Sequence, residues 1–276
     1  MMDSGVLATA GAELYWQAQG EGPAVVLAHG IGGNHAIWYR QLDALSRSNR
    51  VIAFDHRGFG LSRDIDGRGR DAFVDDLTAL LDHLGENKVA LVGQSMGAGT
   101  CIGFAHRVPE RVAALAVCDS LHGIEESAGV KAIMDAARAK TAAMDQIERV
   151  LGAGAPRELA VLYRQIASFN AADRHSLTGR FDVRPAADLA DKGFPILFLC
   201  GFDDILFPVE AMRLVQDEVP GSFLVEINDA GHSAFLEQPV QFNDTILSLL
   251  QMAGHVGQSG PAHSNAAGYV PVGGAA

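Results

Sequence analysis

The amino-acid sequence predicts an α/β fold in which a mostly parallel sheet is covered by helices on both faces. Short apolar segments bounded by turn residues, such as AVVLAHG (24–30) and PILFLCG (195–201), have the length of buried strands. Segments with apolar residues at helical spacing alternate with them, as in DAFVDDLTALLDHLG (71–85). Strands that are apolar throughout are typical of parallel sheets, because these are buried on both faces.

Composition and charge favour an acidic protein with a large aliphatic core. The chain has 276 residues, of which 48% are hydrophobic, and a formal net charge of −12. This charge disfavours nucleic acid and anionic lipid as partners. Cys101, Cys118 and Cys200 lie in apolar segments without metal-site spacing, so we expect no metal, no disulfide and a reducing, cytoplasmic location. We find no signal peptide and no apolar run long enough to span a membrane, which needs roughly 18 residues.

The first part of the chain alternates between strands and helices. Gly85 is the expected C-cap of the first helix, and Pro109 stops the second helix. The predicted elements are a strand and turn in 12–23, strands at 24–30 and 51–54, a helix over 71–85, a strand at 88–92, a helix from 95 to about 107, and a strand ending near 118.

The alternation stops between about Leu121 and Arg184. Helical patterns occupy 132–151 and 157–169 with no convincing strand between them, so we interpret 121–184 as a helical insertion over one edge of the sheet. Ordinary helices packed on the flank of the sheet are the alternative.

The sheet pattern returns at 195–204 and is followed by a helix, a strand and a last helix over 208–219, 222–228 and 233–252. From Gly254 the chain is rich in Gly, Ala, Ser and Pro, which predicts a flexible tail. The expected division is therefore a core made of 1–120 and 185–253, an insertion at 121–184, and a tail at 254–276.

The segment GQSMG (93–97) places a serine between two glycines, after a predicted strand and before a predicted helix. The G-x-S-x-G motif requires this context, because its tight strand-to-helix turn holds the serine in a strained backbone conformation. Gly93 and Gly97 leave room where a side chain would collide with neighbouring elements. We predict that Ser95 is a nucleophile at the carboxyl end of the sheet. A turn without a catalytic role is the alternative.

Five segments together resemble the α/β-hydrolase family, and they occur in the family's order. They are HGIGGN (29–34), DHRGFGLS (55–62), GQSMGA (93–98), GFDDILFP (201–208) and AGHSAFLEQP (230–239). The resemblance covers roughly residues 10–252. It implies a doubly wound sheet of about eight strands, with the insertion as the family's variable helical cap. It also implies a serine hydrolase that needs no cofactor.

The catalytic base is expected late in the chain, because this family places its triad in the order serine, acid, histidine. His232 follows the last predicted strand on a loop that can reach back over the sheet. A base at this position would take the proton of Ser95. His29 and His56 also follow strands but come too early, and the resemblance gives them structural roles.

The acid that orients the base is expected just past an apolar strand. The family pattern G-x-x-D-x-x-x-P, counted from Gly201 to Pro208, selects Asp204. Asp119, at the end of the preceding strand, and Asp203 are the alternatives.

The oxyanion formed on carbonyl attack needs fixed N–H donors. The residue after the nucleophile supplies one, the backbone N–H of Met96, and the resemblance assigns the other to Ile31. His122, Tyr163 and Arg164 are candidate substrate-binding residues in the insertion. Roles on a helix surface or in the core are the alternative for these three.

The leading function is cofactor-free hydrolysis of a small carboxylic ester or lactone through an acyl-enzyme. One alternative is a carbon–carbon bond hydrolase that uses the same triad on a β-diketone or ring-fission product. That group often carries tryptophan after the catalytic histidine, where this chain has Ser233. Another alternative is a ligand receptor with little turnover. Amide and thioester cleavage stay open, the expected partner is a small-molecule substrate, and the sequence does not predict an oligomeric state.

Overall fold

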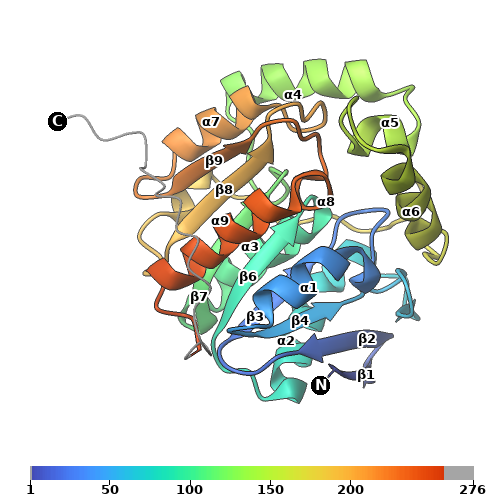
Figure 1. Cartoon of the computed structure of the whole chain (residues 1–276), viewed down its shortest axis with the longest axis vertical. Helices are drawn as coiled ribbons and strands as arrows, with labels where there is room; N and C mark the ends of the chain where they lie inside the picture. The colour runs from blue at the N-terminus through green and yellow to red at the C-terminus, as the bar shows by residue number, and fades with distance from the viewer. Residues whose placement is uncertain (1, 258–276) are drawn as a thin grey trace.

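A sheet of nine strands organises the computed structural model, which describes residues 2–257 (Figure 1). The strand order is β1-β2-β4-β3-β6-β7-β8-β9, and β5 pairs with β2. β2 pairs antiparallel with β1, β4 and β5, while all pairs from β4 to β9 are parallel. The strands are β1 (Met2–Thr9), β2 (Ala12–Gln19), β3 (Ala24–Ala28), β4 (Arg50–Phe54), β5 (Arg63–Asp64), β6 (Val89–Gln94), β7 (Val112–Cys118), β8 (Ile196–Gly201) and β9 (Phe223–Ile227).

The mostly parallel sheet confirms the predicted fold class. Every residue of β3, β6, β7 and β8 is buried, as expected for strands covered on both faces. The sequence analysis missed β1, because its segment MDSGVLAT has no apolar run. β1 forms as an edge strand that pairs with β2 along its whole length through a turn at Gly11, whose φ is 112°.

Helices cover the two faces of the sheet and enclose separate apolar cores (Figure 1). α2, α3 and α7 pack on one face, and α1, α8 and α9 pack on the other. The helices of the core are α1 (Tyr39–Leu45), α2 (Phe73–Leu84), α3 (Met96–Arg107), α7 (Val209–Asp217), α8 (Ala234–Glu237) and α9 (Pro239–Met252). This arrangement is the doubly wound sheet that the sequence predicts.

Two predicted helices are divided in the structure. The last one breaks at Gln238, where Pro239 starts α9 as its first residue. In the insertion, α4 (Ala128–Thr141) ends before α5 (Gln146–Val150), because Asp145 caps α5 in a capping box with Glu148. α1 was not predicted at all.

The inserted segment, 121–184, carries α4, α5 and α6 (Arg157–Ala167) between β7 and β8. Apolar residues of α4 join the core of one sheet face, while those of α5 and α6 join the core of the other. Figure 1 shows α4 beside α7, and α5 and α6 together at the opposite side. The division of the chain into core and cap stays a prediction.

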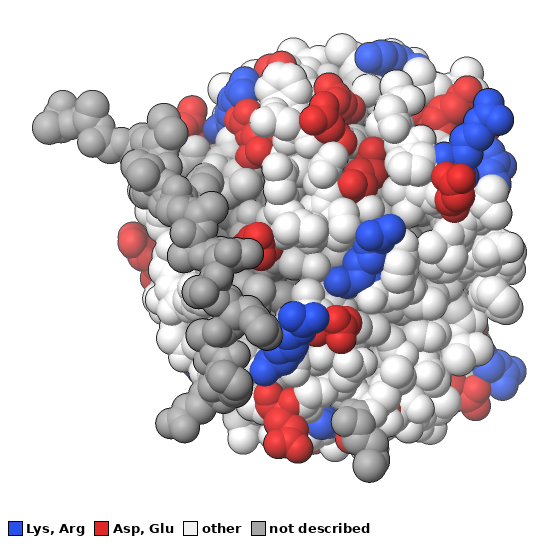
Figure 2. Space-filling view, in the orientation of Figure 1, with Lys and Arg blue, Asp and Glu red and all other residues white. Residues whose placement is uncertain are grey.

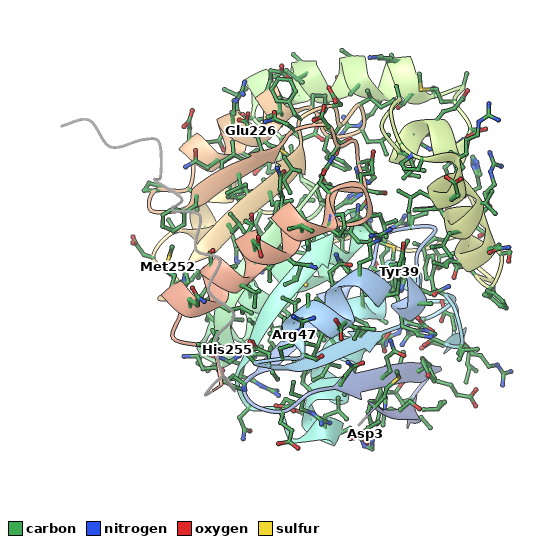
Figure 3. All side chains as sticks on the ribbon, viewed as in Figure 1. Asp3, Tyr39, Arg47, Glu226, Met252 and His255 are labelled. Atoms are coloured by element: carbon green, nitrogen blue, oxygen red, sulfur yellow. The ribbon has the colours of Figure 1, made fainter. Side chains whose placement is uncertain are left out.

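The end of the described chain lies at the amino ends of the central strands. His255, marked in Figure 3, donates from Nε2 to the carbonyl oxygen of Ala24 at 2.8 Å. The amide of Asn49 donates to the carbonyl of His255 at 2.9 Å, and the N–H of Gly257 donates to Ser48 at 2.8 Å. Most of the predicted flexible tail, residues 258–276, lies outside the described residues.

The described surface carries both signs of charge, interspersed on the face shown in Figure 2. Within residues 2–257, none of the helices combines the length and apolar character that crossing a bilayer requires.

Candidate active site

Ser95 occupies the sharp turn between β6 and α3, with φ 51° and ψ −119°. The chain can make this turn only with glycine on both sides. A Cβ on Gly93 would lie 2.6 Å from the Cα of Ala98, and one on Gly97 would lie 2.0 Å from the carbonyl oxygen of Ala28. The serine side chain is 9% exposed, so the turn presents a nearly buried hydroxyl at the carboxyl end of the sheet.

The structure brings Ser95, His232 and Asp204 into one hydrogen-bonded chain. His232 Nε2 lies 2.9 Å from Ser95 Oγ, and His232 Nδ1 lies 2.9 Å from Asp204 Oδ2. His232 and Asp204 are each 4% exposed. Because Nδ1–H donates to the carboxylate, Nε2 is free to accept the serine proton. The three groups have the geometry that general-base activation of a serine requires.

Asp204 is fixed by its own loop. Its Oδ1 accepts the backbone N–H groups of Leu206 at 2.7 Å and Phe207 at 3.1 Å, which leaves Oδ2 for the imidazole. The neighbouring Asp203 has an exposed side chain, and its backbone N–H donates to the carbonyl of Ala230 at 2.9 Å. Of the three carboxylates that the sequence left open, Asp204 is the one bonded to the histidine.

Asp119 lies buried at the end of β7, in a left-handed conformation with φ 49°. Its Oδ1 accepts the N–H of Gly201 at 2.8 Å, while Oδ2 has no hydrogen-bond partner among residues 2–257. Burial raises the pKa of this carboxyl well above its usual range, and the charges of Asp204 and Glu237 raise it further. We therefore expect Asp119 to be a neutral acid that supports the loop carrying Asp204.

A neutral Asp119 should make the stability of the fold depend on pH. A carboxyl whose pKa is higher in the folded than in the unfolded chain stabilises the fold at low pH, and this contribution is lost as pH rises from about 3.9 through the raised pKa. Asp119→Asn lacks this pH-dependent loss of stability. The melting temperature of the variant minus that of wild type should therefore increase by about 3 °C or more between pH 5 and pH 8. Calorimetry at both pH values measures this difference. A difference that stays constant with pH would contradict the neutral assignment.

Two buried histidines fix the loop that approaches the nucleophile. His29 Nδ1 donates to the carbonyl of Gly30 at 2.9 Å, and its Nε2 accepts the N–H of His56 at 3.0 Å. Burial lowers the pKa of both imidazoles, which keeps them neutral as this pattern requires. A Cβ on Gly30 would lie 2.8 Å from Ser95 Cβ, so the loop runs directly beside the serine. The structural role expected for the two histidines agrees with these contacts.

The predicted oxyanion donors lie on the two segments that flank Ser95. The backbone N–H groups of Ile31 and Met96 have no acceptor within residues 2–257. Met96 is the first residue of α3, where backbone N–H groups lack intrahelical partners and the helix dipole favours negative charge. Both donors are therefore available to a ligand, although their role stays a prediction.

The three candidate substrate-binding residues have different surroundings. The Tyr163 hydroxyl is buried and donates to the carbonyl of Ile31 at 3.2 Å, so it supports the oxyanion loop. Arg164 is exposed and pairs with Asp145 at 3.3 Å on the surface of the inserted segment. We therefore leave Arg164 out of the proposed substrate site. The sequence pattern around α6 did not distinguish these two neighbours.

His122 lies two aromatic contacts away from the imidazole of His232. Its ring centroid is 5.4 Å from Phe207 and 5.7 Å from Phe181, and the Phe207 ring stacks on His232 at 5.6 Å. Burial, with the nearby charge of Arg70 second, lowers the pKa of His122 to about 4. At neutral pH this histidine is an uncharged polar group in an otherwise aromatic wall.

A small apolar cluster includes both predicted oxyanion donors. It consists of Phe59, Phe73 and Met96 with Ile31, Ala172, Leu177 and Phe181 packed against it. The inserted segment therefore packs against the residues that flank Ser95.

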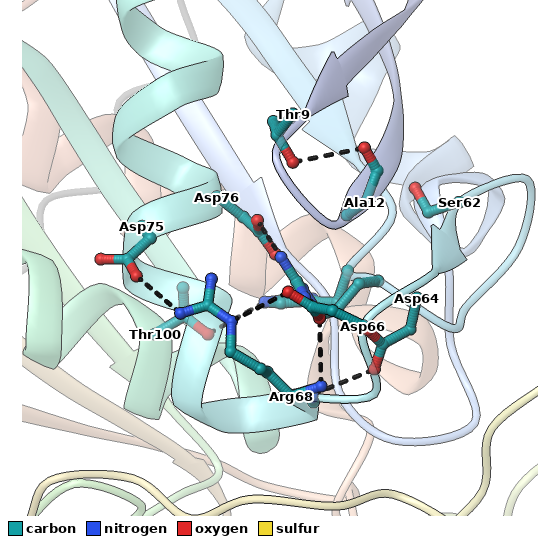
Figure 4. Close-up of polar contacts among 12 residues, drawn as sticks. Thr9, Ala12, Ser62, Asp64, Asp66, Arg68, Asp75, Asp76 and Thr100 are labelled. Carbon is teal, nitrogen blue, oxygen red and sulfur yellow. Dashed lines mark hydrogen bonds and ion pairs between the residues drawn. The ribbon is translucent and has the colours of Figure 1, made fainter.

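An ion cluster holds the loop after β4, away from the reacting groups. Arg57 is buried and donates twice to Asp76, at 2.7 Å each, and also to Asp66 at 2.6 Å and Asp64 at 3.2 Å. Figure 4 shows Asp64, Asp66 and Asp76 gathered here with Arg68. These contacts give Arg57 a structural role.

Sequence reasoning missed a contact that positions the loop of His232. The side-chain amide of Gln94 donates to the backbone carbonyl of His232 at 2.8 Å. Gln94 is the last residue of β6, next to Ser95, so the end of β6 holds both Ser95 and the loop of His232. No local pattern could have indicated this contact, because its partner lies far along the chain.

Comparison with known proteins gives a family model described as alpha/beta hydrolase fold, which matches residues 23–163 and 155–239. A putative carbamate hydrolase, RutD of Azorhizobium caulinodans, is 27% identical over 252 residues, covering 86% of this chain and 94% of the relative.

Two solved structures have the same fold and moderate sequence identity. A thermophilic esterase from Thermogutta terrifontis, with malate bound, matches with a TM-score of 0.75 and 28% identity over 92% of this chain and 99% of its own. The enol-lactonase of Burkholderia xenovorans LB400 matches with a TM-score of 0.73 and 25% identity over 90% of this chain and 100% of its own.

Proposed function

The chain belongs to the α/β-hydrolase family, and from this premise we propose that it hydrolyses a small carboxylic ester or lactone through an acyl-enzyme, without a cofactor. The observation that carries the proposal is the hydrogen-bonded chain from Asp204 through His232 to Ser95. Proton transfer from the serine requires an oriented base of this kind.

In the proposed reaction, Ser95 Oγ attacks the substrate carbonyl carbon while its proton passes to His232 Nε2. The imidazolium is stabilised by Asp204, and the tetrahedral oxyanion accepts the N–H groups of Ile31 and Met96. His232 then returns the proton to the leaving alkoxide as the carbon–oxygen bond breaks. Water attacks the acyl-enzyme by the same steps and releases the acid. Losing one such N–H donor typically costs about 3 kcal/mol of transition-state stabilisation.

The aromatic residues near His232 favour an apolar substrate with a single polar feature. Phe181 and Phe207 flank His122, whose neutral ring can exchange one hydrogen bond with a substrate oxygen. The named relatives act on a carbamate, an ester or an enol lactone, each of which contains a carbonyl bonded to nitrogen or oxygen. Their chemistry favours this substrate class for the present chain.

A fluorophosphonate probe tests the reaction type directly. We expect stoichiometric labelling of Ser95, located by mass spectrometry of the labelled peptide, with loss of p-nitrophenyl ester turnover.

A substrate comparison then separates the competing functions. Turnover of p-nitrophenyl esters and small lactones, with no cleavage of a ring-fission dienoate, supports the proposal. Faster cleavage of the dienoate would favour the carbon–carbon bond hydrolase instead. Labelling without turnover of any carbonyl substrate would favour the receptor.

A further inference from the structure

We infer that Glu237 is a positioning residue whose carboxylate holds the inserted segment against the loop that carries His232. Glu237 ends α8, the single helical turn that follows the histidine. Its Oε1 accepts the backbone N–H of Gly231 at 3.1 Å, and its Oε2 accepts that of Gly152 at 2.8 Å. Gly231 directly precedes the histidine, and Gly152 lies between α5 and α6. One side chain therefore joins the catalytic loop to the inserted segment.

The two glycines bring these backbones into direct contact. A Cβ on Gly231 would lie 2.5 Å from the nitrogen of Gly152, and a Cβ on Gly152 would lie 2.8 Å from Glu237 Oε2. With no side chain between them, a displacement of the inserted segment acts on Gly231 and so on the residue that follows it. Val150 and Ala230, on either side of this contact, belong to the same apolar core.

The carboxylate of Glu237 is held by backbone donors and not by an ion pair. No lysine, arginine or histidine lies within ion-pair distance of it in the described chain. Burial, the largest effect, raises the pKa of Glu237, while the N–H groups of Gly152 and Gly231 lower it. Because both oxygens face donors, the ionised form fits this position.

The other supports of the catalytic loop come from the core alone. Gln94 holds the carbonyl of His232, and the N–H of Asp203 holds the carbonyl of Ala230. The Glu237 contact differs because it includes the inserted segment, whose residues also pack in the apolar cluster of Ile31 and Met96 beside Ser95. A substrate that shifts this segment would thereby change the position of the base. The inference rests on the proposed function and adds a coupling between substrate binding and catalysis.

Glu237→Gln tests the inference in the full-length protein. Glutamine has one acceptor oxygen, so its NH2 must face one of the two backbone N–H groups. We expect kcat for a p-nitrophenyl ester to fall about tenfold with KM changed less than about twofold, because the base is misplaced. Hydrogen exchange should accelerate both in the peptides that cover Gly152 and in those that cover Gly231.

Two further variants separate positioning from charge and from general loss of a carboxylate. Glu237→Asp keeps the charge but is too short to accept from both backbone N–H groups, so kcat should fall in this variant as well. Glu226→Gln is the matched control, because Glu226 pairs with Arg213 on the surface and should change none of these readouts. Wild-type kinetics in folded Glu237→Gln and Glu237→Asp would overturn the inference. Failure of the proposed function would show separately, as ester turnover that survives loss of Ser95.

Discussion

Replacing Ser95 with alanine should lower kcat for ester hydrolysis by about 10⁴-fold or more, which is the scale of nucleophile loss in serine hydrolases. The substitution removes the hydroxyl oxygen that lies 2.9 Å from His232 Nε2. Alanine has the same backbone restrictions as serine at φ 51°, so the turn should keep its shape and the protein its melting temperature. Steady-state kinetics with a p-nitrophenyl ester, together with calorimetry, measure both quantities.

A matched serine supplies the control for this result. Ser248 lies on the exposed side of α9 and donates to the carbonyl of Asp244 at 2.8 Å. Ser248→Ala should keep wild-type kcat and fluorophosphonate labelling. Ester turnover that survives in Ser95→Ala would mean that another group is the nucleophile, and the proposed mechanism would then be wrong.

The residues whose chemistry depends on local spacing were predictable from the sequence. Gly93 and Gly97 are needed because the strand-to-helix turn brings their Cα atoms against Ala98 and Ala28, and this requirement appears in the sequence as a five-residue motif. The buried strands were predictable for a similar reason, since a strand covered on both faces must be apolar throughout. Such features need no knowledge of distant contacts.

Features that depend on a distant partner were not predictable. β1 has little apolar character of its own and exists because β2 supplies its hydrogen bonds. The contacts of Gln94 with His232 and of Glu237 with Gly152 each join residues remote in the chain. No sequence spacing around a glutamine or glutamate indicates such a role, so these positioning contacts can be identified only from the structure.

The choice between Asp204 and Asp119 as the proposed acid depends on both local spacing and distant contacts. Asp204 and Asp119 each follow an apolar strand, so position alone left both open. The structure separates them by hydrogen bonding: Asp204 Oδ2 lies 2.9 Å from the imidazole, while Asp119 bonds to the N–H of Gly201. Their electrostatic situations also differ, because Asp119 is buried without a cation and its pKa is raised.

This difference predicts unequal effects of the same substitution. Asp204→Asn should lower kcat by about 10³- to 10⁴-fold, because an amide facing Nδ1 favours the tautomer whose Nε2 carries a proton and cannot accept one from Ser95. Asp119→Asn should lower kcat less than about tenfold, because an amide oxygen can still accept the N–H of Gly201 and a neutral acid carries no charge to lose. Parallel kcat measurements on the two folded variants decide the assignment. If the loss is greater in Asp119→Asn, the imidazolium depends on the carboxylate at the end of β7, and the roles of the two acids must be exchanged.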